Sequence, residues 1–278
     1  MQEATAYTAL GLVAGAYGAI VGSGGGFVIM PALLLWGGLP VAQSVGTSLC
    51  AVFAGGVAAT WQHARRRDLD WATSLRLATT AVPGAVLGSL LASRVPHGPF
   101  SVAFGALLML IGVAIARRPG NPFVSLRERS QAYGAYMRRK VTVRRIEDAA
   151  GHRWSYYVDL RRGLPLAFAA GCLSALAGIG GGVLLVPALI LAMRLPHVVA
   201  VGISSALLAI TALSGAAAAA AHGAVRWGPA FALAVGSVAG SIAGVALDRR
   251  ISSGAVARLL AAGLVVIGLR LLAEPFLG

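Results

Sequence analysis

Long apolar stretches, separated by short polar segments, make up most of this chain. They run over residues 9–35, 41–60, 72–93, 99–116, 163–193, 198–221, 227–247 and 253–273. A helix that spans a bilayer needs about 20 apolar residues, whereas the strands of a membrane barrel alternate apolar and polar residues over about 10 positions. The continuous runs therefore predict helices, and the pattern indicates an all-α polytopic membrane protein.

The apolar pattern contains an internal repeat. The segment Gly22-Ser23-Gly24-Gly25-Gly26, followed by Pro31, returns at an offset of 156 residues as Gly178-Ile179-Gly180-Gly181-Gly182, followed by Pro187. We therefore expect two homologous transmembrane halves, residues 1–116 and 163–278, joined by a linker at 117–162. Glycine-broken apolar segments at corresponding positions of two halves are typical of the substrate sites of secondary transporters.

The glycine runs interrupt the first apolar stretch of each half. Each glycine costs a helix about 1 kcal/mol against alanine, and a break at membrane depth must face protein or a water-filled cavity. Two arrangements fit. In one, both stretches cross the membrane, which gives eight spans and parallel halves. In the other, each stretch is a re-entrant hairpin of two half-helices of about 12 residues, followed by three transmembrane helices, so that the halves are inverted repeats.

The first basic residue is Arg65. A basic-free N-terminus fits a location outside the cytoplasm, which favours the inverted arrangement.

Composition and charge agree with a membrane protein. The chain is 58% hydrophobic and 12% charged, with a mean hydropathy of +0.79, whereas soluble domains average about 25% charged residues. The net charge is +14, and twelve of the 23 basic residues lie between Arg117 and Arg162. Basic residues collect in cytoplasmic loops, so we expect a multi-pass protein of the plasma (inner) membrane with a cytoplasmic linker, and no nucleic-acid partner.

The linker contains a candidate β-hairpin. Val141–Val143 and Trp154–Val158 are rich in strand-forming residues and flank the polar turn Glu147–His152. A spacer that touches anionic lipid headgroups and a regulatory platform both fit this segment.

The acidic residues favour an anionic substrate. All nine lie in loops, in the linker or at span ends, whereas intramembrane cation and proton sites usually depend on buried carboxylates. The two cysteines and five histidines lack metal-ligand spacing, and no catalytic triad is recognisable. The sequence therefore predicts neither enzymatic activity nor a cofactor or metal.

A candidate anion site follows from the breaks. A new half-helix should begin near Phe27 and near Val183, and its first amides have no partners within the helix. Glycines let an anion approach such amides closely, and hydroxyls on the next helix of each half add donors. The candidate substrate-binding residues are Gly22, Ser23, Gly24, Gly25, Gly26, Phe27, Thr47, Ser48, Gly178, Gly180, Gly181, Gly182, Val183, Ser204 and Ser205.

Each element of this site has a plainer interpretation. Glycine clusters also permit close helix packing, and the hydroxyls of Ser48 and Ser204 could bond to the carbonyl four residues earlier in their own helix. His63 and His222 end comparable helices, where they could carry a coupling proton or could simply be solvated.

At these residues the chain resembles the TauE/SafE family of sulfite-exporter-like permeases. The resemblance rests on the paired glycine–proline elements and on Val-Gly-Thr-Ser at 45–48 with Val-Gly-Ile-Ser at 201–204, and it covers about residues 10–116 and 163–273. It implies transport of small sulfur-containing anions such as sulfite or organosulfonates. Because Ile179 replaces Ser23 and Ile203 replaces Thr47, any site must be asymmetric.

The sequence thus predicts a secondary transporter of small anions that alternates its halves about a midplane site. An anion channel of the same architecture and a non-transporting membrane scaffold are the alternatives. The expected partners are the small anion and the lipid bilayer, with a homodimer as one option.

Overall fold

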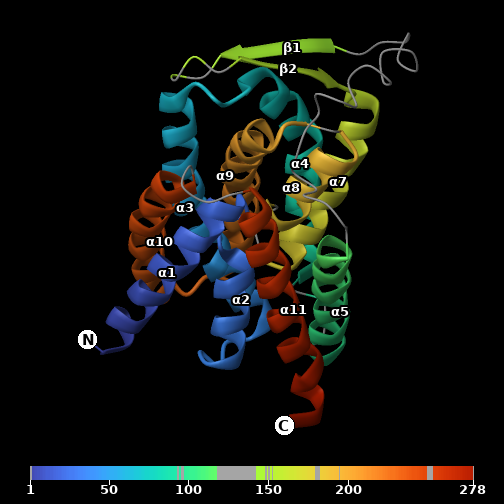
Figure 1. Cartoon of the computed structure of the whole chain (residues 1–278). Coiled ribbons are helices and arrows are strands. Elements are labelled where there is room, and N and C mark those ends of the chain that lie inside the picture. The colour runs from blue at the N-terminus through green and yellow to red at the C-terminus, as the bar shows by residue number, and fades with distance from the viewer. Residues whose placement is uncertain are drawn as a thin grey trace.

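The computed structural model shows a bundle of helices with one β-hairpin (Figure 1). It describes every residue except 1, 93, 95–96, 118–141, 148, 150, 152, 179–181, 194, 249–252 and 278. The mostly helical membrane-protein architecture predicted from the apolar runs is confirmed.

The two halves contain the same succession of helices. The first half has α1 (Gln2–Val21), α2 (Gly26–Leu35), α3 (Val41–Arg66), α4 (Trp71–Ala92) and α5 (His97–Ala116). The second half has α7 (Leu160–Leu176), α8 (Gly182–Leu191), α9 (His197–Ala221), α10 (Trp227–Asp248) and α11 (Ser253–Leu277). Because α2 and α8, and likewise α4 and α10, begin at the offset of the sequence repeat, the repeat of sequence is a repeat of structure.

The helix break between α1 and α2 depends on glycine. Gly22, Gly24 and Gly25 have φ values of 75°, 72° and 74°, and Gly178, after α7, has a φ of 68°. This left-handed region is strained for residues with a Cβ. At the first break the chain turns tightly, with the Ser23 amide donating to the Gly18 carbonyl at 2.7 Å.

Each short helix folds back along the helix before it. In the second half, the side chain of Met193, just after α8, lies against Gly163 near the start of α7. In the first half, Ile29 and Leu33 of α2 share a buried cluster with Ala14 of α1. Each half therefore opens with a helical hairpin.

The helices before the breaks are longer than the predicted half-helices. α1 has 20 residues and α7 has 17, whereas α2 and α8 have ten each. In α1 the additional length comes from the polar N-terminal turns, largely exposed, which precede the apolar stretch that begins at residue 9.

The central pair of helices, α3 and α9, runs antiparallel. Gly46, near the start of α3, lies against the Ala224 carbonyl in the α9–α10 corner. Gly202, near the start of α9, lies against the Asp68 carbonyl in the α3–α4 corner, where an added Cβ would be 2.9 Å from the oxygen. Each central helix thus begins where the other ends.

The outer helices pack closely through glycines. α1 lies along α10, and its repeat counterpart α7 lies along α4. Gly236, Gly240 and Gly244 form a stripe on α10 against carbonyls of α1, and a Cβ at any of them would overlap that backbone. Small residues at four-residue spacing let membrane helices approach to backbone contact.

A β-hairpin covers one end of the bundle (Figure 1). β1 (Thr142–Glu147) and β2 (Arg153–Val158) pair antiparallel, with Thr142 opposite Val158. Tyr156 and Val158 are buried in a cluster with residues of α4, α7, α8 and α9, and the Ala149 amide donates to the Arg66 carbonyl at 2.9 Å. The hairpin is therefore anchored to both halves.

Five helical segments among the described residues are long and apolar enough to cross a membrane. They are Glu3–Val21, Val41–Arg66, Trp71–Ala92, Val198–Ala221 and Trp227–Leu247. Large apolar side chains on the outside of the bundle remain exposed, such as Phe231 at 74% and Val266 at 65%. An apolar exterior of this kind suits lipid rather than water.

The glycine stripe gives a test of the packing between α1 and α10. Gly240→Ala should destabilise the fold by about 1–3 kcal/mol, because the new methyl group overlaps the Leu12 carbonyl. Gly228→Ala, on the same helix with nothing within 4 Å, should be neutral or stabilising by up to about 1 kcal/mol. Thermal unfolding in detergent checks both, and equal effects of the two variants would contradict the close contact.

Candidate functional site

The two helix breaks meet inside the bundle. A Cβ added at Gly182, the first residue of α8, would overlap the carbonyl of Gly22 and the Cα of Ser23 in the first break. A Cβ added at Gly22 would lie only 3.0 and 3.2 Å from the side chains of Val186 and Val201. The beginning of α8 is therefore packed directly on the interruption that precedes α2.

Two serines bind the breaks reciprocally. The Ser48 hydroxyl on α3 donates to the Gly178 carbonyl at 2.7 Å, and the Ser204 hydroxyl on α9 donates to the Gly22 carbonyl at 2.9 Å. Both serines are fully buried. Each half thus supplies the hydrogen bond for the carbonyl at which the helix of the other half is interrupted.

These bonds decide between two interpretations of the serines. Ser205 bonds to the Val201 carbonyl four residues earlier, as the plainer interpretation expects for a helical serine. That interpretation is wrong for Ser48 and Ser204, whose protons go to the opposite half. In this conformation neither proton is free for an anion, and both hydroxyls instead hold backbone carbonyls in place.

Ser23 provides a free polar group at the meeting point. Its side chain is fully buried, and its Oγ has no hydrogen-bond partner among the described residues. Among the described residues, the amides of Gly26 and Phe27 at the start of α2 have no backbone acceptor either. Buried polar groups without partners are rare in native proteins and call for an explanation.

The remaining glycine-motif residues have structural contacts. Gly24 lies against the Leu208 side chain and Gly25 against the Ala14 carbonyl. The Phe27 ring is buried against Tyr17, with the ring centres 5.4 Å apart, so only its amide is available to a ligand. Gly180 and Gly181 lie outside the described residues, as does the side chain of Val183.

Thr47 lies apart from the breaks. Its Oγ1 accepts a hydrogen bond of 3.0 Å from the Arg226 amide, which ties the beginning of α3 to the α9–α10 corner. Of the predicted residues, the structure brings together Gly22, Ser23, Ser48, Gly178, Gly182 and Ser204.

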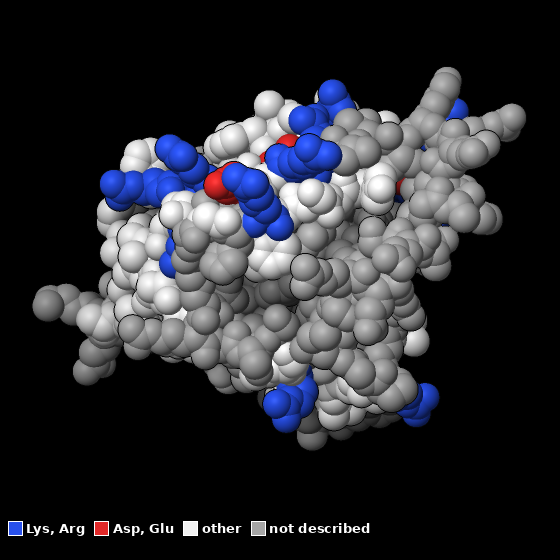
Figure 2. All heavy atoms as spheres, turned by 45° about the horizontal axis from the view of Figure 1, so that its top comes forward, with Lys and Arg blue, Asp and Glu red and all other residues white. Residues whose placement is uncertain are grey.

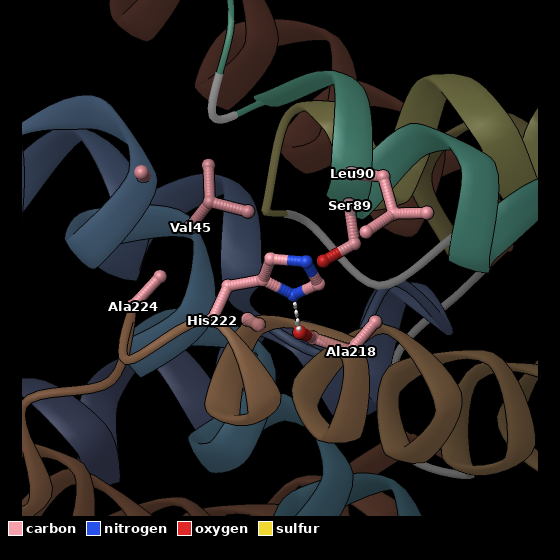
Figure 3. Close-up of a pocket in the computed structure, with 8 residues that line it drawn as sticks. Val45, Ser89, Leu90, Ala218, His222 and Ala224 are labelled. Carbon is pink, nitrogen blue, oxygen red and sulfur yellow. Dashed lines mark hydrogen bonds between the residues drawn. The ribbon is translucent and has the colours of Figure 1, made fainter.

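The two histidines have different surroundings. His63 is 2% exposed, and its Nδ1 is 2.9 Å from Asp68 Oδ1, while its Nε2 is buried without a partner among the described residues. His222 is exposed, and its Nδ1 is 2.9 Å from the Ala218 carbonyl (Figure 3).

His222 lines a small hollow at the end of the bundle opposite the β-hairpin. Figure 3 shows its imidazole between Ala218 and Ser89, and Val45 and Ala224 form other parts of the wall. The hollow therefore lies where α3 begins, α4 ends and α9 ends.

The α3–α4 corner, residues 67–70, contains two buried carboxylates, which the sequence analysis assigned to the end of a span. Asp68 is 2% exposed and Asp70 is 6% exposed. The Thr73 amide and the Tyr156 hydroxyl donate to Asp70 at 3.0 and 2.8 Å, and Arg144 Nε is 3.9 Å away. Burial, together with the Asp70 hydrogen bond, raises the pKa of Tyr156 well above its usual range.

Part of this corner was visible in the sequence. Asp70 directly precedes α4 and has Thr73 three residues later, which is the arrangement of a helix N-cap. Nothing in the sequence indicated burial, because that comes from β1 and β2, which fold over the corner from residues far along the chain.

Among the described residues, no group of three or more His, Cys, Asp or Glu side chains could hold a metal ion. The site at the breaks is instead made of amides, hydroxyls and carbonyls.

The fold defines the class first: this is a multi-pass helical membrane protein whose two repeated halves meet at their helix breaks. The family model for the sulfite exporter TauE/SafE matches residues 7–271. The chain belongs to the TauE/SafE family. The family and its similar proteins identify it as a membrane transporter.

Similar proteins cover nearly the whole chain. It is 29% identical over 272 residues to the probable membrane transporter protein YunE of Bacillus subtilis, which covers 95% of this chain and 96% of that protein. It is 30% identical over 250 residues to a probable membrane transporter protein of Xylella fastidiosa (strain Temecula1), with 87% and 84% covered. No solved structure gives a significant match.

The reciprocal bonds lead to a stability prediction. Ser48→Ala and Ser204→Ala should each lower the free energy of unfolding by about 1–3 kcal/mol, because each leaves a buried carbonyl unpaired. Ser205→Ala should cost less, since its hydroxyl only supplements a bond within α9. Unfolding of the purified protein in detergent measures all three. A Ser48→Ala variant as stable as Ser205→Ala would show that the bond between the halves contributes little.

Proposed function

We propose that the chain is a secondary transporter of small anions, with sulfite, organosulfonates or a related sulfur oxyanion as substrate, and that it works by alternating access about the meeting point of its two breaks. The observation that carries the proposal is the buried hydroxyl of Ser23, which has no hydrogen-bond partner among the described residues, beside the first amides of α2, for which the same residues provide no backbone acceptor.

The chemistry of the meeting point suits an anion. The start of α2 presents amide protons and the positive end of a helix dipole. Ser23 adds one hydroxyl proton, and the start of α8 lies against it. These donors bind an oxyanion without a buried permanent cation, so release does not require breaking an ion pair.

The serines of α3 and α9 support the site indirectly. Carbonyl oxygens would repel an anion, and those of Gly22 and Gly178 are held by Ser204 and Ser48. We therefore assign the two serines the role of positioning the breaks, with Ser23 as the side-chain donor. Because residue 179 is isoleucine, the second half has no hydroxyl at the corresponding position.

We further propose that the halves are inverted repeats with re-entrant hairpins. The antiparallel course of α3 and α9 and the folding back of α2 and α8 support this arrangement. Figure 2 shows basic side chains gathered at the β-hairpin end, where Arg65, Arg67, Arg145 and Arg153 are exposed. The positive-inside rule then puts the hairpin and the linker in the cytoplasm, and the tip after α2 outside.

A channel of the same architecture would move the same anions. The two differ in exchange: a carrier accelerates uptake of labelled sulfite when unlabelled sulfite is present inside the vesicle, whereas a channel does not. A non-transporting scaffold would move no sulfite under either condition.

Cysteine labelling tests the orientation. In a variant without Cys50 and Cys172, Trp36→Cys should react with an impermeant maleimide from outside intact cells, because Trp36 is 80% exposed beyond α2. Ser155→Cys, exposed on β2, should react only after permeabilisation. Labelling of both positions from the same side would exclude the re-entrant arrangement.

The binding role of Ser23 gives a direct test. Ser23→Ala should raise the KM for sulfite in proteoliposomes about tenfold or more, because a hydrogen bond to a charged group contributes about 1.5–3 kcal/mol. Ser237→Ala is the matched control, since its hydroxyl is also buried without a partner among the described residues but lies on α10. Equal KM values for both variants and the unmodified protein would remove Ser23 from the site.

A further inference from the structure

We propose that the buried His63–Asp68 pair is a proton-binding site that holds the cytoplasmic mouth of the transporter shut. The proposal rests on the proposed function for its direction and membrane side. The site binds a proton, and proton binding determines whether the cytoplasmic side of the bundle is open or closed.

The geometry of the pair suits proton binding. His63 and Asp68 are each 2% exposed, and His63 Nδ1 lies 2.9 Å from Asp68 Oδ1. The second ring nitrogen, Nε2, is buried and has no partner among the described residues. The carboxylate thus fixes the ring through one nitrogen and leaves the other to take or lose a proton.

The sequence repeat shows what the pair replaces. The hollow at the opposite end is lined by Val45, Ala219 and Ala224, whose counterparts at the offset of 156 residues are Val201, His63 and Asp68. Where the second half has two alanines and leaves a hollow, the first half has two ionisable side chains that bond to each other. The pair therefore fills the position that is hollow at the opposite end of the bundle.

The corner around the pair is closed by further contacts. The β-hairpin binds it through the Ala149 amide on the Arg66 carbonyl and the Tyr156 hydroxyl on Asp70. The Asp68 carbonyl lies against Gly202, two residues before Ser204, which holds the first break. Opening the corner thus moves the segment of α9 that contacts the substrate site.

Proton binding at His63 should favour the closed corner. In the closed corner, a protonated His63 and the Asp68 carboxylate form a neutral pair, whereas a neutral ring would leave an uncompensated buried negative charge. A proton at Nε2 therefore adds an ion pair to the contact that closes the corner, and its loss removes that attraction, so protonation favours closure and deprotonation favours opening.

Other ionisable groups adjoin the pair. They are Arg66 and Asp70 in the same corner and Arg144 and Tyr156 on the hairpin. None of these four side chains has an ordinary pKa between about pH 5 and 8, and the other histidines are tested by substitution.

The experiment measures opening without relying on transport. In the full chain without its native cysteines, reconstituted in liposomes, Leu69→Cys places a thiol in the corner between Asp68 and Asp70, where Leu69 is 8% exposed. Its rate of reaction with an impermeant maleimide is measured from the hairpin side at pH 6 and pH 8. Division by the rate at the exposed Ser155→Cys corrects for the pH dependence of an exposed thiol. The normalised rate should rise about fivefold or more with pH.

Substitutions assign the effect to the pair. His63→Gln and Asp68→Asn should each abolish the pH dependence, whereas His197→Gln and His222→Gln should retain it. A normalised rate that is equal at the two pH values in the unsubstituted corner, or a pH dependence that survives His63→Gln, would overturn the proposal. If a substituted protein does not fold, the pH comparison on the unsubstituted corner still decides. A pH-dependent corner in a protein that moves no sulfite would refute the proposed function and leave the proton site standing.

Discussion

A helix that is interrupted inside a bilayer leaves amides and carbonyls that hydrocarbon cannot solvate, and the rest of this structure follows from how they are satisfied. The two interruptions satisfy each other, because Ser48 and Ser204 each bond to the carbonyl at the break of the opposite half. Neither half could bury its break alone, so the halves must fold together. The contact also requires glycine at position 182, since any Cβ there would overlap the first break. The same interaction that stabilises the fold therefore brings two helix N-termini to one point.

Glycine has two separate roles in this chain, and they explain its abundance. At the breaks it allows left-handed backbone, as at Gly22 and Gly25. Along α10 and α4 it allows helices to touch backbone to backbone, as at Gly240 and Gly88. Lipid provides no hydrophobic drive for one helix to bury its apolar face against another, so close van der Waals contact must supply the association. The tight outer pairs, α1 with α10 and α7 with α4, then leave the central helices α3 and α9 to carry the contacts between the breaks.

Local features of the fold could be predicted from the sequence, whereas contacts between distant segments could not. Glycine runs and prolines act on the nearest turn, so the new helices near Phe27 and Val183 were predicted within one residue of the observed Gly26 and Gly182. The partners of Ser48 and Ser204 depend on the antiparallel packing of α3 and α9, which no local pattern encodes. Asp68 and Asp70 were correctly placed at a span end, but the prediction assumed that a span end faces water. The β-hairpin, which comes from residues about 80 positions later, buries this one instead.

The two halves share the residues that support the interrupted backbone, and they differ at the residues to which we assign anion and proton binding. The glycines at the breaks and the serines that hold them occur twice, because both interruptions need the same support. Ser23, His63 and Asp68 occur once, opposite Ile179, Ala219 and Ala224. An apolar substitution at either duplicated serine would leave a carbonyl unpaired in one half, so the fold depends on both serines. At the single positions the backbone needs no side chain, and each half is free to differ. We therefore assign the proposed chemistry to these three single positions: Ser23 belongs to the proposed substrate site, and His63 and Asp68 to the proposed proton site in the α3–α4 corner.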